Sequence, residues 1–100
     1  REDVRLELAL AGFFSGRADE SQKQALESYL RLRVRSAMEL LLRQGRLEEL
    51  ERLLNLGWLT PGTLEDGLSL AIELKSTEGF VLLLRRKAEQ VGFSDRDFSL

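Results

Sequence analysis

The sequence contains no cysteine and no histidine. Without cysteine, the chain has neither a disulfide framework nor a thiolate nucleophile, a composition that fits a reducing compartment and leads us to expect a cytoplasmic protein. Without histidine, it lacks the commonest metal ligand and the commonest general base, which excludes a Ser-His-Asp arrangement within this chain. We therefore expect no catalytic residue, no metal and no cofactor, and we predict that the chain is not an enzyme.

Proline, long apolar runs and an excess of one charge are also missing. Pro61 is the only proline, and the longest apolar run, Phe80 to Leu84, is far too short to span a bilayer. The 15 basic and 17 acidic side chains leave a formal charge of −2, so no overall field recruits nucleic acid or an anionic membrane. We expect no membrane contact. Because the chain has no initiator methionine, we also expect it to be a fragment of a larger protein.

Leucine dominates what is present, with glutamate and arginine around it, and this composition favours helix. The chain is 43% hydrophobic and 32% charged, a balance that is typical of globular domains and not of disordered chains. Its 100 residues are enough for one domain with a modest core. We therefore predict a single all-α domain over residues 1–100.

Capping residues and apolar periodicity predict about five helices. Gly16, Gly45 and Gly57 are expected to end helices, and Thr60 before Pro61 is a typical helix start. The expected helices cover residues 1–16, 21–44, 46–56, 61–75 and 77–90, followed by a tail at 91–100.

The helix expected at 21–44 is the longest and has a rival interpretation. Its apolar stripe recurs every three or four positions at Leu26, Leu30, Val34, Ala37 and Leu41. The strict alternation of apolar residues and arginine from Leu30 to Arg35 is also typical of a half-buried strand. We favour one continuous helix because the stripe continues on both sides, no turn residue interrupts it, and Leu and Arg are good helix formers.

A leucine-rich phrase occurs twice in the chain, thirty positions apart. The matching pairs are Glu48 and Glu78, Leu50 and Phe80, Leu53 and Leu83, and Leu54 and Leu84. One helical pair cannot bury its apolar face alone, so we predict that antiparallel hairpins at 21–57 and 60–90 stack side by side as a short solenoid. The positions that we expect to be buried in the second hairpin are Leu64, Leu68, Ala71, Ile72, Phe80, Val81, Leu83 and Leu84.

Residues 45–57, a small turn residue before a Leu-rich helix closed by glycine, resemble the second helix of an ankyrin repeat. Residues 66–71 stand where that family carries its Thr-Pro-Leu-His-x-Ala turn and first helix. Gly67 and Ser69 replace the proline and the histidine, and the chain has no room for the family's β-hairpin tips. Residues 36–87 thus resemble a divergent ankyrin-like helical repeat, of the kind appended to larger bacterial proteins. The resemblance implies a protein-binding module without enzymatic activity.

Five arginines form the densest group of one charge: Arg31, Arg33, Arg35, Arg43 and Arg46. As a functional site, they would pair with phosphates. On a helix, however, successive residues step by about 100°, so these side chains fan out instead of lining up. Glu27 and Glu39 stand four residues from Arg31 and Arg35, a spacing that gives ordinary pairs within a helix. We favour a solvated helix face and keep Arg31 and Arg35 as candidate partner-binding residues.

Aromatic residues are the other candidates. Trp58, next to a glycine in a loop, belongs to a residue type enriched at binding hot spots, although a packing role between hairpins fits it better. Phe93 and Phe98 lie in a polar tail, where they would either dock into a partner or cover the exposed end of the helix stack. The carboxylates predict no metal site, because neighbouring positions on a helix point in different directions.

These features predict a non-enzymatic protein–protein interaction or scaffolding module of a larger polypeptide. Its partner is expected to be another protein or other domains of the same chain. The candidate partner-binding residues are Trp58, Phe93, Phe98, Arg31 and Arg35. The alternative is nucleic-acid binding through the arginine-bearing helix, which the balanced net charge disfavours.

Overall fold

The computed structural model describes residues 2–90, which contain helices and no strand, so the all-α prediction is confirmed. The helices are α1 (Glu2–Ser15), α2 (Glu20–Leu32), α3 (Val34–Gln44), α4 (Leu47–Asn55), α5 (Pro61–Leu74) and α6 (Thr77–Gln90). The predicted tail at 91–100 lies outside the described residues, and with it the expected roles of Phe93 and Phe98.

Side-chain caps start two of the helices where the sequence predicts a start. The Asp19 carboxylate accepts a hydrogen bond from the Gln22 backbone N–H at 2.8 Å, and the Gln22 side chain accepts one from the Asp19 N–H at 3.2 Å. This reciprocal arrangement is a capping box. Thr60 caps α5 by accepting from the Thr63 N–H at 3.2 Å, while Pro61 fills the first helical position, where no N–H is needed.

The expected single helix at 21–44 is wrong, because the chain turns at Arg33 between α2 and α3. The Arg33 N–H bonds the Leu30 carbonyl in a tighter turn, and the Arg33 guanidinium reaches the Tyr29 carbonyl at 3.3 Å while stacking on the Tyr29 ring. Arginine thus supplies the donor that a helix C-terminus lacks. The prediction of five helices becomes six in residues 2–90, and the rival strand at Leu30 to Arg35 does not occur.

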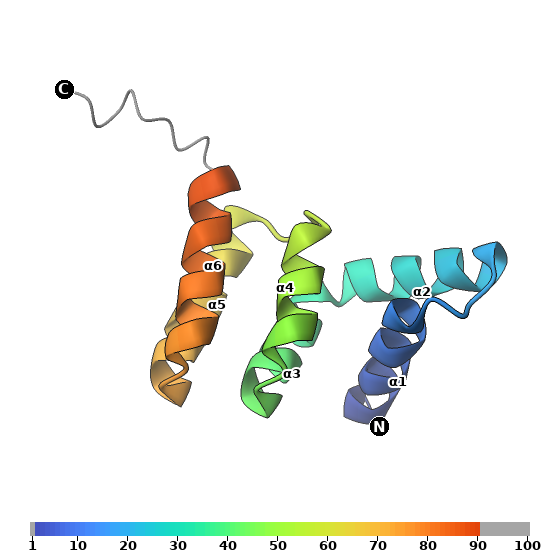
Figure 1. The fold of residues 1–100 in the computed structure, drawn as a ribbon, viewed down its shortest axis with the longest axis horizontal. Helices are drawn as coiled ribbons and strands as arrows, with labels where there is room; N and C mark the ends of the chain where they lie inside the picture. The colour runs from blue at the N-terminus through green and yellow to red at the C-terminus, as the bar shows by residue number, and fades with distance from the viewer. Residues whose placement is uncertain (1, 91–100) are drawn as a thin grey trace.

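This break lets α2 run across the other helices instead of along them (Figure 1). The helix packs mainly against α1, and α1 also contacts α3. The remaining four helices form two hairpins, α3–α4 and α5–α6, which lie next to each other with α3 against α5 and α4 against α6.

The turns of the two hairpins use the same hydrogen bonds at positions thirty apart. Gly45 and Lys75 both adopt the left-handed conformation, with φ of 68° and 59°. Each donates its backbone N–H to the carbonyl three residues earlier, that of Leu42 or Ile72. The next residue, Arg46 or Ser76, donates its N–H to the carbonyl five residues earlier. Glycine adopts this conformation freely, whereas Lys75 accepts it at a cost that the native contacts must offset.

Two glycines set how closely the hairpins approach. A β-carbon at Gly67 on α5 would stand 2.7 Å from the Sδ of Met38 on α3, and one at Gly79 on α6 would stand 2.7 Å from a methyl group of Leu42. Both distances are shorter than non-bonded contacts of a β-carbon allow, so the glycine backbones are in direct contact with side chains of α3. Met38 is fully buried, and only 3% of Leu42 is exposed. Gly67 inside a helix costs about 1 kcal/mol relative to alanine, and this contact accounts for its presence.

The buried core is mostly leucine, with three alanines and Met38, and extends from α1 to α6. Leu53, Leu64, Ala71 and Leu83 are buried as the sequence predicts. The predicted burial of three other residues is wrong: Ile72 is 64% exposed, Leu84 47% and Val81 43%. They lie on sides of α5 and α6 that no helix in residues 2–90 covers, although their helical spacing matches that of core positions.

We predict that Gly67→Leu lowers the free energy of unfolding by about 1–3 kcal/mol or more, because a side chain there has to displace Met38 and Leu83. Chemical denaturation measured by circular dichroism tests this. Ser69→Leu introduces the same side chain on the exposed side of the same helix and should change stability by less than about 0.5 kcal/mol. Equal losses in the two variants would contradict the close contact at Gly67.

Candidate functional site

The chain assembles an aromatic–arginine cluster from Phe13, Phe14, Trp58, Arg31 and Arg52. Trp58 follows Gly57, whose φ of 77° turns the chain out of α4. The Trp58 ring lies half-buried with its centroid 5.7 Å from that of Phe13, and Phe13 meets Phe14 edge-on at 5.5 Å. Aromatic pairs at these separations are favourable beyond the area they bury.

Arginines from two helices complete the cluster. Arg52 on α4 stacks over Phe14 at 4.6 Å and donates to the Phe14 carbonyl at 3.2 Å, which ties the end of α1 to α4. Arg31 on α2 lies 5.4 Å from the centroid of Trp58, and 58% of its side chain is exposed. A guanidinium over an aromatic face is attracted by the ring quadrupole. Tryptophan and arginine are also the residue types that most often dominate protein interfaces.

Two of the residues predicted from sequence therefore meet, and one does not join them. Trp58 and Arg31 come together in the cluster, whereas Arg35 points to α5 and pairs with Asp66 at 2.9 Å and with Glu39 at 3.6 Å. Phe93 and Phe98 lie outside the described residues.

Phe13, Phe14 and Arg52 belong to the cluster but are not among the site residues predicted from the sequence. The available signal was the Phe13–Phe14 pair at the end of α1. Two adjacent aromatic residues on a helix point in different directions, so one neighbouring helix cannot cover both. Nothing in the spacing of the chain indicates which loop they meet, because Phe14 and Arg52 are far apart in the sequence.

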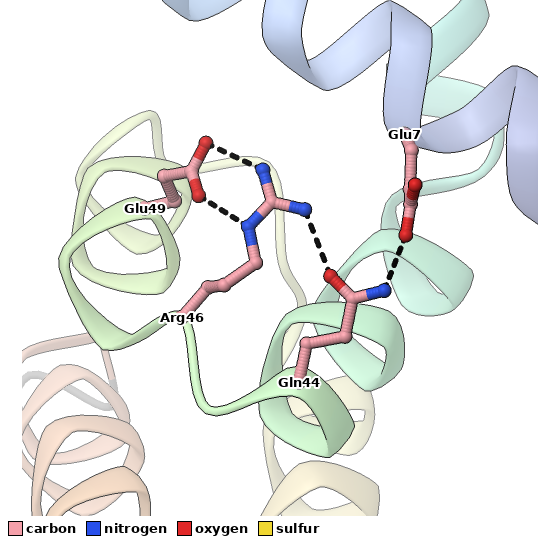
Figure 2. Close-up of polar contacts among 4 residues, drawn as sticks. All are labelled: Glu7, Gln44, Arg46 and Glu49. Atoms are coloured by element: carbon pink, nitrogen blue, oxygen red, sulfur yellow. Dashed lines mark hydrogen bonds and ion pairs between the residues drawn. The ribbon is translucent and has the colours of Figure 1, made fainter.

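A second polar linkage holds α1, α3 and α4 together (Figure 2). Arg46 makes a two-bond ion pair with Glu49, one arm of which is 2.8 Å long, and donates to Gln44 at 2.8 Å. Gln44 in turn donates to Glu7 on α1. The hydrogen bond to Glu49 raises the pKa of Arg46, with the charges of Glu49 and Glu7 adding to the effect and partial burial opposing it. Arg46 therefore has a structural role, with its guanidinium bound to both Glu49 and Gln44.

Within the part of the chain that the structure describes, no group of three or more His, Cys, Asp or Glu side chains is placed to hold a metal ion. None of the helices over residues 2–90 combines the length and the apolar character that crossing a bilayer requires. Several carboxylates pair with neighbouring cations. Glu65 accepts a hydrogen bond from Lys87 at 2.8 Å, and this hydrogen bond lowers the pKa of Glu65.

A scan against models of protein families finds no match for this chain, and searches among curated proteins and among solved structures find none either. No relative therefore contributes to an assignment of function, which depends on the residues described above.

Trp58 is the only tryptophan, so its fluorescence reports on the cluster alone. We predict that Phe13→Ala shifts its emission to longer wavelength and increases quenching by acrylamide, because the contact at 5.7 Å shields the indole from water. Leu8→Ala on the same helix is the control, since Leu8 is 68% exposed and its loss should leave the emission unchanged. An unchanged spectrum in Phe13→Ala would contradict the observed packing.

Proposed function

We propose that this chain is a non-enzymatic protein–protein interaction module made of stacked helical hairpins, part of a scaffold within a larger cytoplasmic polypeptide. Supporting this proposal, the α3–α4 and α5–α6 turns carry the same hydrogen bonds thirty positions apart, and α3 lies against α5 as α4 does against α6. Stacked hairpins of this kind form the extended surfaces that helical repeat proteins use for binding. The resemblance of residues 36–87 to ankyrin repeats points to the same function.

The observation that carries the proposal is the aromatic–arginine cluster. Trp58 is half-buried, so its ring is held in place by Phe13 while part of it stays accessible. Arg31 lies over that ring with 58% of its side chain exposed. One of its nitrogens contacts Glu27 at 3.5 Å, and the other donors are available to a partner. A rigid aromatic anchor beside an accessible guanidinium is the composition typical of an interface hot spot.

Nucleic-acid binding through the arginines has less support. Arg31 contacts Glu27 at 3.5 Å, Arg35 pairs with Asp66 at 2.9 Å, and the two lie on different helices after the break at Arg33. A phosphate backbone would have to compete with these carboxylates, and the arginines form no single track along one helix.

We predict that Arg31→Glu weakens capture of a protein partner by fivefold or more. The substitution replaces the cation beside Trp58 with an anion, which repels a partner surface that is complementary to arginine. The immobilised chain is incubated with extract of the source cells, and the retained proteins are quantified by mass spectrometry. Arg43→Glu is the matched control: it makes the same charge change on an exposed α3 position outside the cluster and should retain the partner.

A labelled single-stranded oligonucleotide tested by fluorescence anisotropy at low salt separates the two functions. Protein binding predicts no anisotropy change with the unmodified chain. Salt-sensitive oligonucleotide binding that both charge reversals weaken would favour the nucleic-acid alternative. If the unmodified chain retains no protein, or if Arg31→Glu retains as much as Arg43→Glu, the cluster is not the binding site.

A further inference from the structure

The outer side of the α5–α6 hairpin carries an apolar surface that no helix in residues 2–90 covers. We call it the end face and define it by Leu68 and Ile72 on α5 and Phe80 and Leu84 on α6. Ile72 is 64% exposed and Leu84 47%, while Leu68 and Phe80 are half-buried. A hollow of about 210 Å³ opens between Ile72 and Phe80 near the turn at Lys75.

Each residue of the end face has a counterpart thirty positions earlier in the α3–α4 hairpin. The counterparts of Leu68, Ile72, Phe80 and Leu84 are Met38, Leu42, Leu50 and Leu54. All four are buried, with exposures of 3% or less. The same pattern of side chains is therefore buried in one hairpin and only partly shielded in the other.

The structure shows what shields two of the counterparts, Met38 and Leu42. Met38 and Leu42 face Gly67 and Gly79, at a separation that leaves no room for a β-carbon. The covering element is thus a helical hairpin with a small residue on each helix at the point of contact. The Met38 and Leu42 side chains pack against helices that carry no side chain at the point of contact.

We propose that the end face is a docking site for a further helical hairpin, contributed by another protein, that carries glycine or alanine where α5–α6 carries Gly67 and Gly79. The inference rests on the proposed function, since it names the chemistry of one partner of the interaction module. A hairpin on the end face would extend, in the same direction, the interface already formed between α3–α4 and α5–α6.

A second copy of this chain does not offer such a hairpin. In each copy, the Gly67 and Gly79 side of α5–α6 already covers Met38 and Leu42. The positions thirty earlier, Ala37 and Glu49, are also occupied, because Ala37 is fully buried and Glu49 is bound to Arg46. A second copy therefore does not present the small-residue side of its own α5–α6 hairpin to the end face.

The test uses a copy of residues 56–85 as the probe hairpin, inserted after Arg85 in the full chain so that every turn recurs at the same spacing. The protein has no cysteine, so Ile72→Cys in the original hairpin introduces a unique thiol. We predict that the thiol reacts rapidly with a maleimide in the chain without the insertion and at least about tenfold more slowly with it. The denaturant m-value should rise by about a third, because the inserted hairpin unfolds with the rest.

Two controls make the result specific. Leu8→Cys on α1 is the first, because Leu8 is as exposed as Ile72 and labelling there should not change on insertion. Gly67→Leu placed only in the inserted copy should restore rapid labelling of the Ile72→Cys thiol, because the contact needs a small residue. Equal labelling of that thiol with and without the insertion, protection that persists with Gly67→Leu, or slow labelling in the chain without insertion would each overturn the proposal. Failure here leaves the Arg31→Glu capture result unaffected, so the two proposals fail separately.

Discussion

The contact of two glycine backbones with the side chains of α3 is the constraint on which the rest of the structure depends. Because Gly67 and Gly79 have no β-carbon, α5 and α6 come close enough to bury Met38 fully and to leave only 3% of Leu42 exposed. That distance in turn lets α4 meet α6. A chain of this size has little apolar area to spare, so a wider gap between the hairpins would leave the core incomplete.

Local signals in the sequence predict most helix ends but not the path of the chain. Gly45, Gly57 and the Thr60–Pro61 pair mark ends and starts because each has a backbone property that other residues lack. The break at Arg33 has no such mark. It depends on packing between α2 and α1 and on a guanidinium that reaches a carbonyl one turn earlier, and neither is specified by the apolar spacing.

Periodicity also identifies apolar faces without showing which of them are covered. Ile72 and Leu84 have the spacing of core residues and lie in water, because burial depends on a neighbour that the pattern does not specify. The candidate site shows the same limit. Trp58 stands out by composition and Arg31 by charge, but their contact depends on the direction in which α2 runs before the break at Arg33. Arg35, on α3 after the break, pairs with Asp66 instead. The aromatic–arginine cluster and the end face are the two surfaces on which we base a binding function.

Native-state hydrogen exchange tests the central claim, that the two hairpins shield each other and open as one unit. The account predicts that the slowest amides of α3, α4, α5 and α6 exchange with the same opening free energy and the same denaturant dependence, because uncovering Met38 and Leu42 requires α5–α6 to leave. If the α5–α6 amides exchange through a separate opening of much lower free energy while those of α3–α4 stay protected, the hairpins are independent and the account is contradicted.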